Sequence, residues 1–167
     1  MKDKSLVGAA GEHLVLSRLL SRGLLASQAP RGTMKVDILV NPHDGGMPRL
    51  IQVKTRSPIG KTLGWHMGAK HEHMQEENLF YCFVNLDLLQ PSVWVIPSKV
   101  VANVVADSHQ EWLDTPGHLL CVTLLTFPIE RSDLLHRKNL WMSFNNSYTF
   151  NTYFTQVHPV IRSREKL

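Results

Sequence analysis

The stretch Ile51-Gln52-Val53-Lys54-Thr55 decides the fold that this chain is expected to adopt. Its apolar and β-branched residues predict a short strand inside a sheet. Because side chains alternate between the two faces of a strand, Gln52 and Lys54 share one face and the other three residues share the opposite face. A buried ammonium group without a partner is strongly unfavourable, so an anionic group is expected opposite Lys54.

A second strand with one polar residue precedes this stretch. Val36-Asp37-Ile38-Leu39-Val40 is apolar apart from Asp37, and residues 41–48 between the two strands are dense in turn-forming residues. Two strands joined in this way are expected to lie in one sheet, with Asp37 near Gln52 and Lys54. We interpret these three side chains as one polar cluster that holds a metal ion and a phosphate group.

An N-terminal helix is predicted over residues 5–22, where apolar side chains recur at helical spacing and Ser5 is a suitable N-cap. Gly8 and Gly11 both lower helix propensity, and we expect them to permit close packing against another element. Glu12 falls on or beside the apolar face. It is either an edge residue that reaches solvent or a member of the polar cluster.

The order of strand and helix patterns along the chain predicts an α/β or α+β domain. One domain is expected, because 167 residues with 43% hydrophobic content suit a single core. Residues 1–117 form the predicted core, and residues 118–167 are a C-terminal extension of the same domain whose structure the sequence does not define. Strands are expected at 24–29, 34–40, 50–55, 79–86, 93–96 and 119–127, a loop at 57–68, and helices at 69–77 and 97–106 with a further turn at 109–113.

Charge and cysteine content set broad limits on the partners and the compartment. Eighteen Lys and Arg against fourteen Asp and Glu give a net charge of +4, which permits a polyanionic partner without requiring one. Cys82 and Cys121 lie in apolar runs and are expected to be core residues of a protein from a reducing compartment. The chain shows neither a signal-peptide pattern nor a membrane-spanning run, so a cytoplasmic protein without a membrane partner is predicted.

Several motifs together resemble the PD-(D/E)XK nuclease superfamily, which includes restriction endonucleases and Holliday-junction resolvases. The resemblance covers residues 5–116. It implies a restriction endonuclease-like core, in which helices flank a central mixed β-sheet in the order α-β-β-β-α-β. The stretches that carry it are Gly11-Glu12 and residues 36–40, 51–55, 61–65, 79–84 and 93–98.

By position, the resemblance implies that Asp37 binds a metal ion and that Lys54 is the active-site lysine. Gln52 stands where most members have Glu or Asp, which makes the chain a QxK variant, and Glu12 matches a helix glutamate that some members add to the site. The implied activity is that of a Mg2+-dependent (or Mn2+-dependent) endonuclease that hydrolyses phosphodiester bonds of DNA. RNA as a substrate and a homodimeric assembly are also compatible with the superfamily.

The chemistry of these groups agrees with that role. Mg2+ prefers oxygen ligands, which the Asp37 carboxylate, the Gln52 amide and the Val53 backbone carbonyl supply. Glu12 would add negative charge, directly or through water. Such an ion polarises a phosphate and activates a bound water, while Lys54 would orient that water or offset charge in the transition state. An amide at position 52 carries no charge, so metal affinity is expected to be weaker than with a carboxylate.

Basic side chains around the expected site would suit contacts with the phosphates of DNA. Trp65 is expected to be exposed or partly exposed, where it either stacks on a base or deoxyribose or packs over the sheet. The basic residues are Arg31, Lys35, Arg49, Arg56, Lys61 and Lys70.

Three other interpretations stay open. Glu12, Asp37 and Lys54 would also suit a purely structural salt-bridge cluster. A nucleic-acid-binding module that keeps the fold and does not cut is another alternative. A zinc site is disfavoured against a solvated helix face, because the spacing does not match a helical zinc motif. The side chains concerned are His66, His71, Glu72, His73 and Glu76.

Overall fold

The computed structural model describes residues 3–30, 32–57, 64–86, 90–114 and 123–125, with the backbone alone at positions 111, 112 and 123–125. In chain order the elements are α1 (Lys4–Leu20), β1 (Leu25–Gln28), β2 (Ile38–Asn41), β3 (Arg49–Arg56), β4 (Trp65–Met67), the 3-10 helix η1 (Ala69–His73), β5 (Leu79–Asn85), β6 (Ser92–Pro97), α2 (Ser98–Asp114) and β7 (Thr123–Leu125).

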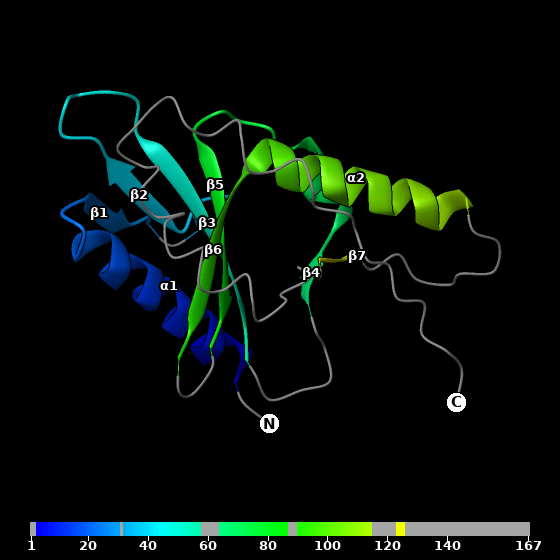
Figure 1. The fold of residues 1–167 in the computed structure, drawn as a ribbon, viewed down its shortest axis with the longest axis horizontal. Helices are drawn as coiled ribbons and strands as arrows, with labels where there is room; N and C mark the ends of the chain where they lie inside the picture. The colour runs from blue at the N-terminus through cyan, green and yellow to red at the C-terminus, as the bar shows by residue number, and fades with distance from the viewer. Residues whose placement is uncertain (1–2, 31, 58–63, 87–89, 115–122, 126–167) are drawn as a thin grey trace.

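Five strands form one mixed sheet in the order β1-β2-β3-β5-β6. Its neighbouring strands are antiparallel except for β3 and β5, which run parallel and are connected through β4 and η1. The helices α1 and α2 pack on opposite faces of this sheet (Figure 1). This arrangement confirms the expectation of an α+β domain with a mixed sheet flanked by helices.

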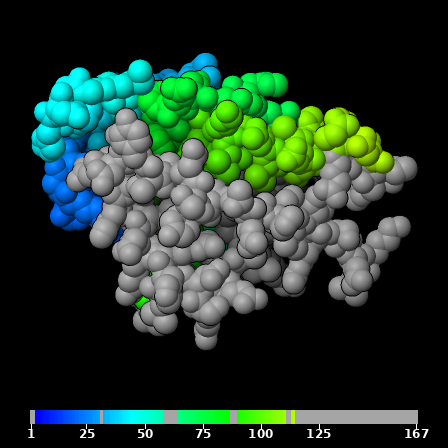
Figure 2. Space-filling model, turned by 45° about the horizontal axis from the view of Figure 1, so that its top comes forward, coloured from blue at the N-terminus to red at the C-terminus, as the bar shows by residue number. Residues whose placement is uncertain are grey.

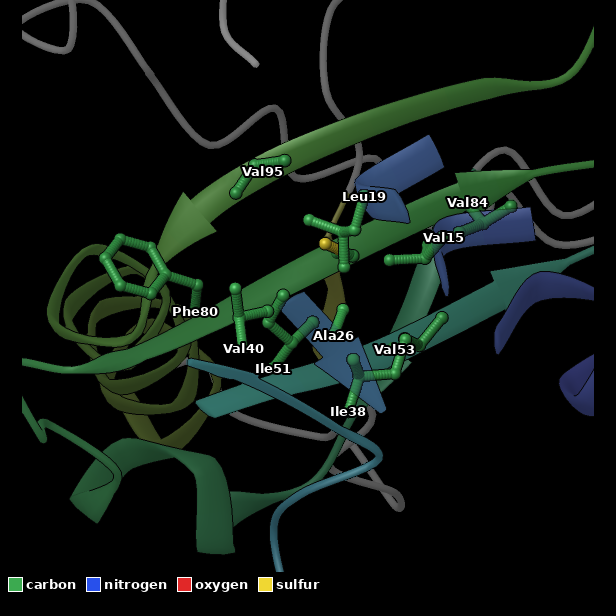
Figure 3. Packing of buried hydrophobic residues seen from close by; sticks show 11 residues of the cluster. Val15, Leu19, Ala26, Ile38, Val40, Ile51, Val53, Phe80, Val84 and Val95 are labelled. Atoms are coloured by element: carbon green, nitrogen blue, oxygen red, sulfur yellow. The ribbon is translucent and has the colours of Figure 1, made fainter. Parts of the chain in front are cut away.

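The face covered by α1 carries an aliphatic core. Val15 and Leu19 of α1 pack against Ile38 and Ile51, which are register partners on β2 and β3 (Figure 3). Since residues directly opposite each other in a sheet share a face, this pair fixes which side chains of the two strands point toward α1. Asp37 and Gln52, one step further along, therefore point toward the other face.

The opposite face is more aromatic. Trp65, Tyr81, Phe83 and Trp94 pack there with residues of α2, and the rings of Tyr81 and Phe83 stack with centroids 5.8 Å apart. Tyr81 and Phe83 are the register partners of Gln52 and Lys54 on β3. Gln52 and Lys54 of β3 thus lie beside this aromatic cluster. The space-filling view shows α2, in yellow-green, extending away from the end of the molecule where α1 lies in blue (Figure 2).

Gly11 allows α1 to approach β3 closely, as expected. A Cβ atom at this position would overlap Oγ1 of Thr55 and lie 2.7 Å from its Cγ2. The same expectation for Gly8 is wrong, because no atom lies within 4 Å of the position where its Cβ would be. Helical phase does not explain the difference, because Gly8 lies two turns before Val15 on the same stripe of α1. Gly8 is one turn nearer the N-terminal end of the helix, where no other element approaches it, whereas Gly11 is buried against Thr55 of β3.

Several predicted boundaries differ from those observed. The N-cap of α1 is Asp3, whose Oδ1 accepts the backbone N–H of Ser5 at 2.8 Å, so Ser5 is not the cap. The predicted loop at 57–68 contains the short strand β4, and the helix predicted at 69–77 is the 3-10 helix η1. The two helical pieces expected at 97–106 and 109–113 are one continuous helix, α2.

Within the expected C-terminal extension, the structure describes residues 123–125, which form β7 and pair with β4. Cys82 is a buried core residue, as expected, whereas Cys121 lies outside the described residues. In the described ranges, no helix combines the length and the apolar character needed to cross a bilayer.

We predict that Gly11→Ala destabilises the protein by about 1–3 kcal/mol, because the added methyl group forces α1 away from Thr55. Gly8→Ala is the matched control and should be neutral or stabilising by up to about 1 kcal/mol, because it adds helix propensity without a clash. Urea unfolding of both variants checks this. Combining Gly11→Ala with Thr55→Ala should recover part of the lost stability. If Gly11→Ala is as stable as Gly8→Ala, the close packing of Gly11 against Thr55 is contradicted.

Candidate metal and phosphate site

The carboxylate of Asp37 bridges β2 and β3 at the point where their regular pairing stops. The backbone N–H of Asp37 donates to the carbonyl of Ile51 at 2.8 Å, and its Oδ2 accepts the N–H of Val53 at 2.6 Å. The backbone N–H and C=O of one strand residue point to the same side, so the carbonyl of Val53 also faces the β2 side here. A carboxylate and a backbone carbonyl therefore meet at one end of the β2–β3 pair.

Gln52 adds an unsatisfied acceptor beside Asp37. Its Oε1 is buried and has no hydrogen-bond partner, and the same is true of Thr55 Oγ1, Arg56 Nη1 and Asn85 Oδ1 farther along β3 and β5. Leaving a buried acceptor unpaired costs about 1–3 kcal/mol. A donor or a cation at this position would remove that cost.

The oxygen atoms at this place suit a hard divalent cation. Asp37, Gln52 and Val53 offer a carboxylate, an amide carbonyl and a backbone carbonyl, which are the ligand types that Mg2+ and Ca2+ accept. Within the described ranges, no three His, Cys, Asp or Glu side chains gather in a way that could hold a metal ion. Of the three ligands named here only Asp37 is charged, so an ion held by them would keep several waters.

Lys54 lies half-buried on the same face as Gln52, one register step beyond it. Burial lowers the pKa of its ammonium group; the charge of Asp37 opposes this shift and the charge of Lys70 adds to it. In the described part of the chain, Lys54 takes part in no ion pair within 4.0 Å. The charge of Asp37 therefore acts on Lys54, although the two side chains form no ion pair.

Glu12 is positioned by α1, which covers the other face of the sheet. It follows Gly11, the residue in contact with Thr55 of β3, and is half-buried. Asp37, Gln52 and Lys54 point to the face away from α1, and Asp37 and Lys70 are the charges that act on Lys54. Glu12 is carried by the helix on the other face, and its part in the cluster stays a prediction.

The residues predicted to contact nucleic acid separate into different environments. Lys70 is exposed on η1, near Lys54. Lys35 is engaged with Glu76 at 3.2 Å and has a left-handed backbone with φ of 71°. The two described arginines lie over aromatic rings. The guanidinium carbon of Arg49 is 5.7 Å from the ring centroid of Phe80, and that of Arg56 is 4.5 Å from the ring centroid of Trp65. Arg31 and Lys61 lie outside the described residues.

The expectation that Trp65 is exposed is wrong. Its side chain is 4% exposed, Nε1 donates to the carbonyl of Val84 at 3.2 Å, and its ring meets Phe83 and Trp94 edge-on. The physical reason is that Trp65 begins a strand in which alternate residues face the core. The sequence signal was the alternation Trp65-His66-Met67, in which the two apolar residues are buried and the histidine is exposed.

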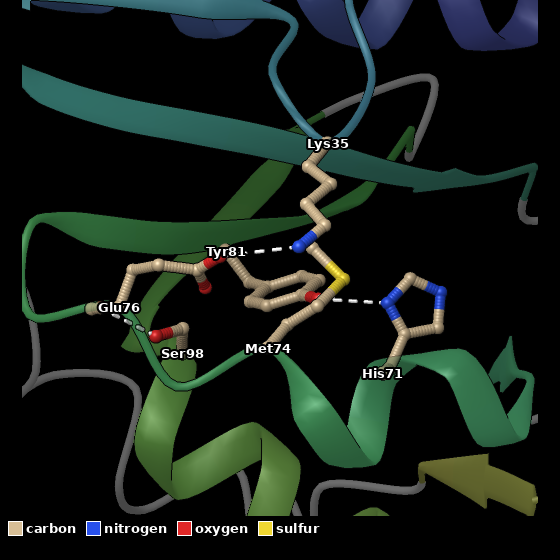
Figure 4. A network of polar contacts seen from close by, with 6 residues as sticks. All are labelled: Lys35, His71, Met74, Glu76, Tyr81 and Ser98. Atoms are coloured by element: carbon tan, nitrogen blue, oxygen red, sulfur yellow. Dashed lines mark hydrogen bonds and ion pairs between the residues drawn. The ribbon is translucent and has the colours of Figure 1, made fainter.

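The expectation that His71 lies on a solvated helix face is wrong. Its side chain is 2% exposed, and its Nδ1 lies 2.7 Å from the hydroxyl of Tyr81, which in turn contacts the sulfur of Met74 at 3.3 Å (Figure 4). Burial and the charges of Lys54 and Lys70 lower the pKa of His71 to about 4. His71 is therefore a neutral imidazole at physiological pH and not part of a solvated helix face.

The histidine and acidic residues weighed as a zinc site do not assemble into one. His71 is engaged with Tyr81, whereas Glu72 pairs with His109 of α2 at 2.6 Å. Glu76 faces Lys35, and its backbone carbonyl accepts the hydroxyl of Ser98 at 2.7 Å (Figure 4).

Comparison of the chain with protein-family models, with curated proteins and with solved structures gave no significant match.

We predict that His71 makes the protein sensitive to mild acid. Its pKa is lower in the folded state than in the unfolded state, so the unfolded chain takes up the proton first and stability falls as pH drops from above 6.5 toward 4. The loss between about pH 7 and about pH 5 should be on the order of 1–2 kcal/mol. Urea unfolding at both pH values measures it. His71→Gln should reduce this pH dependence, whereas His73→Gln, at an exposed position on the same element, should not.

We also predict that Lys54→Met leaves the melting temperature within about 2 °C of the wild-type value or raises it. Burial disfavours the ammonium group in the folded state, so removing the charge relieves a cost. Lys99→Met, at an exposed position on α2, is the control for loss of one lysine. A clear drop in melting temperature for Lys54→Met alone, measured by differential scanning calorimetry, would support the structural salt-bridge interpretation instead.

Proposed function

We propose that this protein is a metal-dependent endonuclease that hydrolyses phosphodiester bonds of DNA. The observation that carries the proposal is the placement of three groups on one face of the sheet. The Asp37 carboxylate, the unpaired Oε1 of Gln52 and the half-buried ammonium group of Lys54 lie together where β2 and β3 part.

Each of these groups has a separate task in the proposed reaction. Asp37, fixed by the N–H of Val53, would hold Mg2+ or Mn2+ together with the carbonyl oxygens of Gln52 and Val53. The bound ion supplies Lewis-acid polarisation of the phosphate and a water of lowered pKa. Lys54 would place its charge beside the phosphate oxygens, where negative charge increases in the transition state.

The order of elements gives further support. The chain runs α1, β1, β2, β3, β4, η1 and β5, with β1–β3 as an antiparallel meander, β5 parallel to β3, and β4 outside this sheet. This order agrees with the α-β-β-β-α-β core of the PD-(D/E)XK superfamily if η1 stands in place of the crossover helix. We therefore propose a restriction endonuclease-like fold in which β6 extends the sheet.

Glu12 has an auxiliary place in this proposal. It is carried by the helix on the other face of β3 and would act on the ion through water, as an addition to the ligands of the polar face. The neutral Gln52 leaves Asp37 as the single carboxylate among the groups on that face, so metal affinity should be modest.

The test uses plasmid DNA and a branched duplex, each incubated with Mg2+, with Mn2+ or with EDTA. We expect cleavage with either metal and none with EDTA. Asp37→Asn and Lys54→Met should each reduce the rate at least about 100-fold, because each removes a group that acts in the transition state. Gln52→Glu should tighten Mn2+ binding, measured by calorimetry without DNA, because it adds a charge to the ligand set.

Lys99→Met, purified in the same way, should cut like the wild type and so controls for the loss of one lysine. The slow cutting expected of Asp37→Asn and Lys54→Met controls for contaminating nucleases. If neither substrate is cut, or if Lys54→Met cuts as fast as Lys99→Met, the catalytic assignment fails. The neutral residue at position 52 favours a second candidate, a module that binds nucleic acid without cutting it. That alternative predicts salt-dependent DNA binding that survives Asp37→Asn unchanged.

A further inference from the structure

Three nitrogen-bearing side chains gather beside the polar half of β3. Lys54 is the register partner of Phe83 on β5, and the ring of Phe83 stacks on that of Tyr81. Lys54 and Tyr81 therefore lie on the same face of the sheet. His71 of η1 is bonded to Tyr81 and lies close enough to Lys54 and Lys70 for both charges to act on it. Two ammonium groups and one imidazole, from β3 and η1, therefore lie near enough for their charges to interact.

The carboxylates around this cluster are engaged elsewhere. Glu72 pairs with His109, Glu76 pairs with Lys35, and Asp37 accepts the N–H of Val53. In the part of the chain that the structure describes, neither Lys54 nor Lys70 has an ion-pair partner within 4.0 Å. Asp37 acts on Lys54 from beyond ion-pair distance, so two neighbouring cations without a direct partner make a place that favours an anion.

Tyr81 fixes the orientation and the tautomer of His71. The Tyr81 hydroxyl has one proton and lies 2.7 Å from Nδ1 of His71 and 3.3 Å from the sulfur of Met74. A thioether is a weak hydrogen-bond acceptor and a neutral imidazole nitrogen is a good one, so we expect the hydroxyl to donate to Nδ1. The ring proton then sits on Nε2, which lies on the side of the ring away from Tyr81 (Figure 4). His71 thus offers an N–H donor that needs no protonation.

We propose that His71, Lys54 and Lys70 form a binding site for a phosphate group, in which the Nε2–H of His71 donates to a phosphate oxygen. The inference rests on the proposed function in that the phosphate would be that of a phosphodiester in nucleic acid. Lys54 and Lys70 supply positive charge. His71, whose ring is held by Tyr81 at Nδ1, supplies a hydrogen bond of fixed direction. Burial of the ring means that this donor is already in place before the ligand arrives, so little conformational entropy is lost on binding.

The experiment is a nitrogen-15 NMR study of the wild-type histidine side chains, without divalent metal. Spectra are recorded for the free protein, with inorganic phosphate, and with a short DNA duplex at matched phosphate concentration. In the free protein we expect His71 to carry its proton on Nε2. Addition of DNA should shift the His71 Nε2 signal and leave His73, exposed on the same element, unchanged. A shift with DNA and none with free phosphate identifies the polymer as the ligand source.

Variants supply the second measurement, DNA affinity by fluorescence anisotropy in EDTA. His71→Gln should weaken binding about tenfold, the effect of losing one hydrogen bond to a charged group. Tyr81→Phe removes a single hydroxyl inside the core and should weaken binding several-fold by releasing the ring. Lys70→Ala should weaken binding and also reduce its salt dependence. His73→Gln should bind like the wild type.

Several outcomes would overturn the site. They are a His71 proton on Nδ1, a His71 signal that stays unchanged when DNA is bound, and a His71→Gln variant that binds as tightly as His73→Gln. The proposed hydrolysis fails separately. If the protein cuts DNA and the His71 Nε2 signal does not change on DNA binding, the nuclease proposal holds and this site is ruled out. If the His71 signal shifts and the protein cuts no DNA, the phosphate site holds and the nuclease proposal is ruled out.

Discussion

One hydrogen bond, from the backbone N–H of Val53 to Oδ2 of Asp37, links β2 to β3 where their backbones stop pairing. A charged acceptor makes this bond stronger than an amide–carbonyl bond, and its length of 2.6 Å is at the short end of the usual range. It replaces a ladder bond that β2 no longer provides and orients the carboxylate toward the face that holds Lys54. The geometry of the proposed site depends on this contact, because it sets the position of its single carboxylate.

The two faces of β3 serve different purposes, and the alternation of its side chains separates them. Ile51, Val53 and Thr55 face α1, and the lack of a side chain at Gly11 lets the helix pack closely against Thr55. Gln52 and Lys54 face the aromatic layer on the other side. Because β3 lies in the middle of the sheet, with β2 and β5 on either side, its backbone is held firmly while one row of side chains is left unpaired. Rigid support of this kind is what a site needs to keep its groups in place.

Much of this was readable from the sequence, because it follows from local pattern. The apolar runs at 36–40 and 51–55 predicted two neighbouring strands, and Gly11 predicted the close approach of α1. Gly8 was misjudged because it shares the helical phase of Val15, and the sequence does not show how far along α1 the contact with β3 extends. Trp65 and His71 were misjudged because their burial depends on contacts with residues distant in sequence, Val84 and Trp94 for the first.

For His71 the deciding contact is with Tyr81 on β5, ten residues further along the chain and in a different layer of the fold. A run of histidines and glutamates looks solvated in sequence, and most of its members are. The 3-10 geometry of η1 turns one of them into the core. No spacing rule for α-helices or strands would have selected that residue, because neither period applies to so short an element.

The distribution of charge separates a structural cluster from a functional one. A salt-bridge network built for stability would pair Lys54 with a carboxylate. Instead, Glu76 holds Lys35 in place and ties its loop to the start of α2 through Ser98, while Glu72 secures η1 against His109. These pairs fix the elements around Lys54 and leave Lys54 itself partly desolvated and uncommitted. Unfavourable local arrangements are often found at functional sites, so this one supports the proposal that Lys54 binds an anion.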